Sequence, residues 1–196
     1  MKFVGNNIYH VYNRSFNKHK VFFSEENYMF FLNKVTELKS LCDILAYCLM
    51  PDHFHLMIYL SSVTRQTAQS GQTGMHPLAR KIGTILSSYT QAINKLEKSK
   101  GSLFQPKTKA KELDENSYAA TCFHYIHQNP LKASLVSKIE EWKFSSFVEY
   151  YRDINNICNK ELAFQLINLS RDKGHFYKES SLQISDSQSL KLFENE

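Results

Sequence analysis

The chain has 196 residues, enough for one domain with a full hydrophobic core and an appended segment. Hydrophobic residues make up 42% and charged residues 22% of the sequence, a balance that excludes a chain disordered throughout. Lysine and arginine outnumber aspartate and glutamate by 24 to 19, and the resulting net charge of +5 permits binding to a polyanion without requiring it.

The first half of the chain predicts a strand, a helix and a hairpin. Strand-forming residues fill 8–14, and an amphipathic helix extends from Ser24 to about Lys39. The apolar run 44–49 and the stretch 50–60 are separated by a tight, proline-containing break, so we expect the two to form a β-hairpin.

The middle of the chain contains the longest helical pattern. Residues 61–74 are polar and predict a flexible connection, after which apolar residues keep helical spacing from Pro77 to Leu96. We expect a fourth strand at 101–105, confined to a sheet edge because Pro106 follows it.

A further helix is predicted from Asn116, with Asn129 at its end because the following Pro130 disfavours helical geometry before it. Residues 161–169 predict a short helix, and from Ser180 the chain is polar and expected to be poorly ordered. We divide the chain into a main domain, 1–150, and a C-terminal helical extension with a polar tail, 151–196.

The order strand, helix, strand, strand, helix, strand is the split βαβ of ferredoxin-like folds, an α+β architecture with an antiparallel sheet. Its two helices cover one face of the sheet. We expect the apolar residues of 54–60 to face those helices, and the helix from Asn116 to dock on the other face, near the strand of the hairpin that carries two histidines.

The histidines of that strand are the first candidate site. His53 and His55 are two residues apart, so in a β-strand both imidazoles project from one face while Phe54 and Leu56 project from the other. Two imidazoles on a rigid strand are half of a metal site. A His-x-His pair is common by chance, so the interpretation needs partners from elsewhere in the chain.

The helix from 116 offers such partners. Tyr125 and Asn129 are four residues apart and therefore lie one turn apart on the same helix face. Tyr118 lies two turns earlier on that face, and His124 and His127 are alternative third metal ligands. We expect His127 to face away from Tyr125 into solvent.

Three segments together resemble the single-tyrosine transposases of the HUH superfamily, nearest the REP-associated tyrosine transposase branch. They are Tyr9–Arg14, Tyr47–Leu56 and Tyr125–Ala133, and the resemblance covers about residues 5–150. It implies a ferredoxin-like, metal-dependent enzyme that cleaves and rejoins single-stranded DNA, usually beside a hairpin, through a covalent phosphotyrosine.

Carried over by position, the resemblance makes His53 and His55 metal ligands, Tyr125 the nucleophile and Asn129 the residue that completes the metal site. Tyr118 is the alternative nucleophile. Many relatives have glutamine at that last position, and asparagine is shorter by one methylene. Two imidazoles and an amide leave the charge of the ion uncompensated, and with oxygens from phosphate and water they suit Mg²⁺ or Mn²⁺.

Lysines concentrate between 95 and 111, and we expect them to bind DNA phosphates together with two basic residues outside this segment. Pro106-Lys107 departs from the family pattern, and the simpler interpretation of the cluster is a solvated surface. The predicted phosphate-binding residues are Arg14, Lys95, Lys98, Lys100, Lys107, Lys109, Lys111 and Lys132.

The partner expected is single-stranded DNA with a hairpin, bound by a monomer or a homodimer. One alternative function is a non-catalytic module that binds single-stranded nucleic acid on its sheet. Another is a zinc hydrolase that uses Cys48 with His53 and His55.

The compartment follows from the cysteines and the apolar runs. The four cysteines show no Cys-x-x-Cys spacing and lie in or near predicted strands and helices, as buried thiols do. The N-terminal residues turn polar too early for a signal peptide, and no apolar run reaches the ~18 residues of a membrane span. We therefore expect a cytoplasmic protein that does not associate with membranes.

Overall fold

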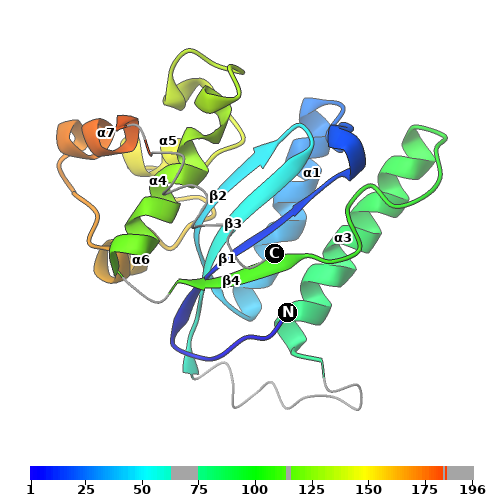
Figure 1. Cartoon of the computed structure of the whole chain (residues 1–196), viewed down its shortest axis with the longest axis horizontal. Coiled ribbons are helices and arrows are strands. Elements are labelled where there is room, and N and C mark those ends of the chain that lie inside the picture. Colours follow the sequence, from blue (N-terminus) through cyan, green and yellow to red (C-terminus); the bar gives the residue numbers. More distant parts are fainter. Residues whose placement is uncertain (63–74, 114–115, 183, 185–196) are drawn as a thin grey trace.

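A four-stranded antiparallel sheet in the order β2-β3-β1-β4 is the centre of the structure, a computed structural model that describes residues 1–62, 75–113, 116–182 and 184 (Figure 1). The connections β1-α1-β2 and β3-α3-β4 make the split βαβ of a ferredoxin-like fold, so the predicted α+β class is confirmed. The strands are β1 Asn7–Arg14, β2 Asp43–Met50, β3 His53–Leu60 and β4 Lys109–Leu113.

Helices α1 (Glu25–Thr36) and α3 (Pro77–Leu96) cover one face of this sheet (Figure 1). The apolar row of β3, including Leu56 and Ile58, is buried against them, as the alternation of residues predicted. The bounds of α3 are those expected from its apolar spacing. The predicted end of the first helix near Lys39 falls in a 3₁₀ turn that continues α1.

The fourth strand lies further along the chain than we expected. Residues 101–105 are irregular, and β4 begins only at Lys109. The amide of Asn13 donates to the carbonyl of Gln105 at 3.0 Å and to Oγ1 of Thr108 at 2.9 Å, which holds this stretch beside β1 without a ladder. Pro106 has no N–H to donate, so regular pairing resumes after it.

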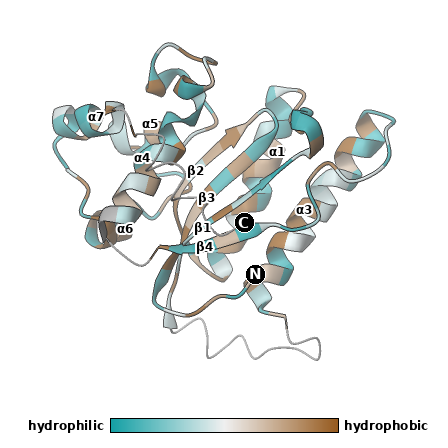
Figure 2. Cartoon of the chain, in the orientation of Figure 1, coloured by the Kyte–Doolittle hydropathy of each residue, from teal (hydrophilic) through white to brown (hydrophobic). Residues whose placement is uncertain are grey.

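Strand β4 is an edge strand whose sequence alternates lysine with other residues. Lys109 pairs with Tyr12 and Lys111 with His10. Lysines on an edge strand discourage pairing with another strand. Figure 2 shows β4 as largely hydrophilic, in contrast to the more hydrophobic β2 and β3.

The second face of the sheet carries α4 (Asn116–Lys132), which docks over β2, with α5, α6 and α7 around it (Figure 1). The prediction that α4 ends at Asn129 is wrong, because the helix continues through Pro130 to Lys132. Proline removes a donor from the helix, and the side-chain amide of Asn129 donates to the carbonyls of Tyr125 at 2.8 Å and Ile126 at 3.5 Å. The bounds of the smaller helices are α5 Phe147–Tyr151, α6 Lys160–Ile167 and α7 Lys173–Ser181.

The outer edge of β2 is covered by later parts of the chain. The N–H of Leu49 donates to the carbonyl of Phe144 at 2.9 Å, and the N–H of Ser146 donates to the carbonyl of Tyr47 at 3.0 Å. These bonds satisfy backbone groups that an edge strand otherwise leaves open.

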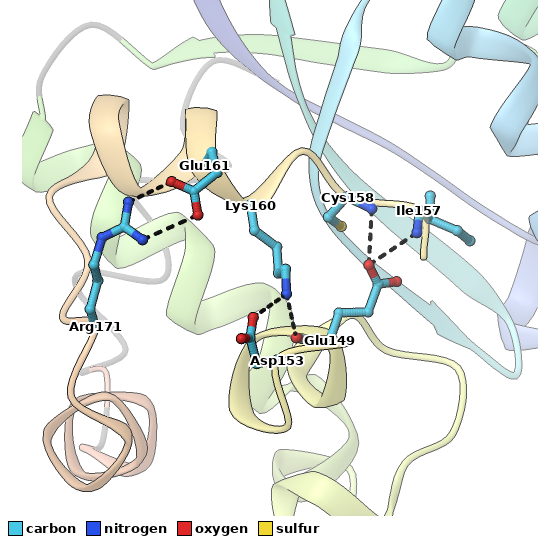
Figure 3. Close-up of polar contacts among 7 residues, drawn as sticks. All are labelled: Glu149, Asp153, Ile157, Cys158, Lys160, Glu161 and Arg171. Atoms are coloured by element: carbon cyan, nitrogen blue, oxygen red, sulfur yellow. Dashed lines mark hydrogen bonds and ion pairs between the residues drawn. The ribbon is translucent and has the colours of Figure 1, made fainter. Parts of the chain in front are cut away.

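Buried polar contacts tie the segment after residue 150 to the sheet. The carboxylate of Glu149 accepts from the N–H groups of Ile157 at 3.0 Å and Cys158 at 2.9 Å (Figure 3). The Tyr47 hydroxyl of β2 also donates to this carboxylate, at 2.9 Å. The ammonium of Lys160, itself buried, lies 2.6 Å from the Asp153 carboxylate. Burial of the Glu149 carboxylate is tolerated because its hydrogen bonds satisfy it. The division at residue 150 stays a prediction.

The C-terminal part also differs from the sequence expectation. Ser180 is fully buried within α7, a helix that the sequence did not predict, and most of the tail expected to be poorly ordered lies outside the described residues. Most of the connection predicted at 61–74 lies outside them too. Among the described helices, none is long and apolar enough to cross a membrane.

Candidate active site

Strand β3 places His53 and His55 side by side on the sheet face that carries α4. The two ring centroids are 4.9 Å apart and the rings are nearly perpendicular, at 84°. Antiparallel pairing sets His53 opposite Arg14 and His55 opposite Tyr12 on β1, so these side chains share the same face. Phe54, between the histidines, is buried on the opposite face with the main core.

Each histidine uses its Nδ1 atom in a hydrogen bond. Nδ1 of His53 lies 2.6 Å from Oδ1 of Asp52, and Nδ1 of His55 lies 2.9 Å from Nε2 of His10 on β1. The hydrogen bond from His53 lowers the pKa of the Asp52 carboxyl, outweighing the opposite effect of its partial burial. An ionised carboxylate only accepts, so it orients the His53 ring with the proton on Nδ1.

The pair formed by His10 and His55 is buried beneath the surface of the sheet. His10 is fully buried and His55 is 3% exposed. Burial lowers the pKa of His10 to about 3, with the charge of Lys111 acting in the same direction. Burial also lowers the pKa of His55 well below its usual value, and the neighbouring His53 and His10 add to this. Both rings are therefore neutral, the form in which imidazole binds metals.

Helix α4 brings Tyr125 over the histidines. The Tyr125 and His55 ring centroids are 5.7 Å apart at an angle of 83°. Burial raises the pKa of the Tyr125 phenol to about 12; the nearby Cys122 adds to the rise and a hydrogen bond from Asn129 opposes it. The Lys132 ammonium lies 5.3 Å from the ring centroid of Tyr125. The phenol is thus protonated at neutral pH and close to a cation.

A cavity of about 380 Å³ joins these residues. Basic side chains surround the histidines and the tyrosine, a charge pattern suited to an anionic ligand. The residues that line it are Tyr12, Asn13, Arg14, Lys18, Asp52, His53, Phe54, His55, Gln105, Lys107, Lys109 and Tyr125.

The other candidate residues of α4 lie elsewhere. Tyr118 does not line the cavity, and its ring lies 5.3 Å from the Lys111 ammonium. His124 bonds through Nδ1 to the Ser180 hydroxyl at 3.0 Å. The expectation that His127 is solvated is wrong: it is fully buried, with Nε2 2.7 Å from the Ser146 hydroxyl. The reason is that α5 and α7 cover the back of α4.

Asn129 also does not line the cavity. It is 9% exposed, and its amide nitrogen donates to helix carbonyls. The Asn129 side chain also forms the hydrogen bond that lowers the pKa of the Tyr125 phenol, so Asn129 is linked to the candidate nucleophile rather than to the histidines. Its role as a third metal ligand therefore stays a prediction.

The predicted phosphate-binding residues separate into two groups. Arg14, Lys107 and Lys109 line the cavity, Lys111 follows Lys109 on the same face of β4, and Lys132 lies beside Tyr125. The others are exposed at the end of α3 and beyond it, and do not line the cavity. These are Lys95, Lys98 and Lys100.

Three residues of this region were not predicted from the sequence. Asp52 directly precedes His53, and its place beside a candidate metal-binding histidine is a signal that could have found it. Lys18 reaches the cavity from the loop after β1, where Asn17 and Lys18 both have positive φ, at 51° and 56°. His10 lies within the motif Tyr9–Arg14, but its partner on another strand gave no local signal.

The donor set fits a divalent cation that keeps open coordination positions. With Nδ1 engaged on both histidines, Nε2 is the nitrogen left for a metal on each. Within the described residues no group of three His, Cys, Asp or Glu is placed to hold a metal ion. This counts against the zinc alternative, although Cys48 lies opposite His55 on β2. Further ligands have to be an amide, water or phosphate oxygens.

Comparison with known proteins finds a similar solved structure. No protein-family model and no curated protein matches it. The structure of a REP-associated tyrosine transposase bound to a REP hairpin is similar, with a TM-score of 0.58 and 15% sequence identity over 81% of this chain and 87% of that one. The chain has the fold of that transposase.

This similarity concerns the backbone, because 15% identity leaves most side chains different. It agrees, at the level of the fold, with the family resemblance that the three sequence segments carried. The similarity therefore leaves the predicted roles of the histidines and of Tyr125 untested.

Proposed function

We propose that the chain cleaves and rejoins single-stranded DNA beside a hairpin, with Tyr125 as the nucleophile and His53 and His55 as ligands of a divalent cation. The observation that carries this proposal is that β3 and α4, far apart in the sequence, bring the Tyr125 ring to 5.7 Å, between centroids, from that of His55. Both residues, with His53, line a cavity that also contains basic side chains. The solved transposase of the same fold, bound to a REP hairpin, supports this assignment of substrate class.

The reaction is a transesterification at phosphorus. The Tyr125 oxygen forms a bond to phosphorus as the bond between phosphorus and O3′ breaks, so the phosphate at the 5′ end of the downstream strand remains on the tyrosine. The phenol releases a proton to water and the departing O3′ takes one up. An incoming 3′-hydroxyl reverses the step, which joins strands without an external energy source.

Activation of the phenol is the main demand on the site. With a pKa of about 12, about one phenol in 10⁵ is ionised at pH 7. The Lys132 ammonium near the ring favours the phenolate. His53 and His55 would hold a divalent cation, which when bound would supply further positive charge for the phosphate and the departing oxygen. Mg²⁺ and Mn²⁺ suit a site completed by oxygen ligands.

The basic residues of the cavity hold the strand. Arg14, Lys18, Lys107 and Lys109 surround the histidines and can neutralise the phosphates on either side of the scissile bond. Their arrangement around one cavity orients the scissile phosphate toward Tyr125, which reduces the entropic part of the barrier. One tyrosine makes one covalent link, so cleavage needs one site, whereas full transposition of a segment needs two.

The test is formation of a covalent adduct. A hairpin-bearing single strand is incubated with the protein and Mg²⁺ or Mn²⁺, and a denaturing gel reveals protein that migrates with attached DNA. We expect the adduct in the wild type and in the matched control Tyr118→Phe, and none in Tyr125→Phe. An adduct in Tyr125→Phe would refute the nucleophile, and binding without an adduct in any variant would support the non-catalytic module.

A further inference from the structure

His10 has no part in the chemistry described above, yet it contacts His55, one of the two proposed metal ligands. It projects from β1, is fully buried, and does not line the cavity. Its ring stacks on Tyr12, with centroids 4.7 Å apart at 28°, and meets the His55 ring edge to edge, with centroids 5.1 Å apart and the ring planes at 24°. Nε2 of His10 lies 2.9 Å from Nδ1 of His55. Stacking and hydrogen bonding together fix the orientation of both rings.

The bond between these imidazoles contains one proton. In a neutral imidazole one nitrogen donates and the other accepts. Both rings are buried, and an additional charge there would be costly, so the pair shares a single proton between the facing nitrogens. Two arrangements result. Either His55 donates from Nδ1 and keeps a lone pair on Nε2, or His10 donates and the proton of His55 is on Nε2.

Only the first arrangement allows His55 to bind a metal through Nε2. For His53 the choice is already made, because the Asp52 carboxylate accepts and cannot donate. For His55 the partner is an imidazole, so His10 must act as the acceptor. Outer partners of this kind determine the tautomer and orientation of metal-binding histidines.

We propose that His10 is a positioning residue that accepts a hydrogen bond from Nδ1 of His55 and so presents Nε2 of His55 to the divalent cation. The inference rests on the proposed function, since it concerns the same cation site. Asp52 and His10 then serve equivalent purposes for the two histidines, one as a partly exposed carboxylate and the other as a buried imidazole on the neighbouring strand.

The first test is made on the metal-free protein and needs no activity. Long-range proton–nitrogen spectra of the histidine side chains distinguish the two neutral tautomers. We expect His55 to carry its proton on Nδ1 and His10 to have an unprotonated Nε2. A spectrum in which His55 is protonated mainly on Nε2 would overturn the proposal.

The second test measures Mn²⁺ affinity by calorimetry. His10→Phe keeps an aromatic ring for stacking but removes the acceptor, and we expect affinity to fall by about 10- to 100-fold. His10→Gln provides an amide oxygen as an acceptor and is expected to restore most of the affinity. Tyr89→Phe is the control, because it removes one buried hydrogen bond, to the Val21 carbonyl, on the other face of the sheet. Its Mn²⁺ affinity should equal that of the wild type.

A double variant, His53→Ala with His55→Ala, separates failure of this inference from failure of the proposed cation site. If the double variant loses Mn²⁺ binding while folded His10→Phe retains wild-type affinity, the role of His10 is refuted and the cation site stands. If the double variant binds Mn²⁺ like the wild type, both fail. Should His10→Phe not fold, the wild-type tautomer and the affinity of His10→Gln decide the matter.

Discussion

The two faces of the sheet differ sharply, although the same strands build both. The face under α1 and α3 is a continuous core of aromatic and aliphatic side chains, in which Phe31, Phe54 and Tyr89 are almost fully buried. The opposite face carries the His10–His55 pair and, over it, Tyr125. Side chains of a strand alternate between faces, so neighbouring residues of β3 serve different purposes. Stability and proposed chemistry should therefore respond to different substitutions.

The largest expected effect is on the chemical face. Tyr125→Phe should abolish cleavage while fold and DNA affinity are kept, because removing one hydroxyl leaves ring packing intact and costs at most ~1 kcal/mol of stability. The measurement is the mass of tyrosine-containing peptides after the wild type reacts with a short oligonucleotide, which should show the nucleotide on Tyr125. A nucleotide on Tyr118, or on no tyrosine, would contradict the assignment.

The next prediction concerns the core face. Leu56, adjacent to His55 on β3, is 2% exposed and packed in the main core. Leu56→Ala should lower the free energy of unfolding by about 2–5 kcal/mol, measured by urea denaturation, with the cleavage rate of the remaining folded protein unchanged. His53→Ala should show the reverse: a small change in stability and loss of cleavage. Equal losses of stability in both variants would remove the distinction between the faces.

A third prediction concerns His124 of α4, which bonds to Ser180 of α7. Burial lowers the pKa of His124 to about 4, below its value of about 6.5 in an unfolded chain. The unfolded state therefore takes up a proton first as the pH falls. His124 contributes stability that is complete above pH 6.5 and is lost progressively down to about pH 4, by about 1–3 kcal/mol. His124→Gln should remove this contribution and so make the fall in stability between pH 6.5 and pH 4 less steep, measured by denaturation at a series of pH values. A pH dependence as steep as that of the wild type would contradict the prediction.

The smallest expected effect concerns the lysines, and it divides the predicted set by position. Lys107 and Lys109 line the cavity. Removing their charges should reduce the slope of log K for single-strand binding against log salt concentration by about 0.7 for each phosphate that is no longer neutralised. Removing those of Lys98 and Lys100 should leave it unchanged. The measurement is DNA affinity at a series of salt concentrations. An equal decrease in slope for both pairs would favour a diffuse basic surface over a single cavity.

Local periodicity was sufficient to predict much of the fold. The apolar spacing of α3 and the alternation of residues in β3 depend only on neighbouring residues, and both were found as expected. The position of β4 depends instead on Asn13, whose amide holds residues from a distant part of the chain. Short helices such as α5 and α7 have weak patterns of their own, because tertiary packing supplies most of their stability.

The candidate site shows the same division. The same-face placement of His53 and His55 follows from strand geometry, which can be read from their spacing. The partners of these residues are non-local: His10 belongs to another strand, and Lys18 reaches the cavity through a backbone turn with positive φ. The burial of His127 depended on helices that were not predicted. The metal-binding and nucleophilic roles stay predictions until the experiments above are made.

The outer edge of β2 is covered by residues that are synthesised much later than β2 itself. The groups that close this edge include those of Phe144, Ser146 and Asn159, whereas β2 itself is complete at Met50. During synthesis the sheet therefore has an open, apolar edge until those later residues emerge, while the lysines of β4 protect the opposite edge as soon as it forms. A chain that stops before residue 144 would keep its β2 edge open to other copies and be prone to aggregate.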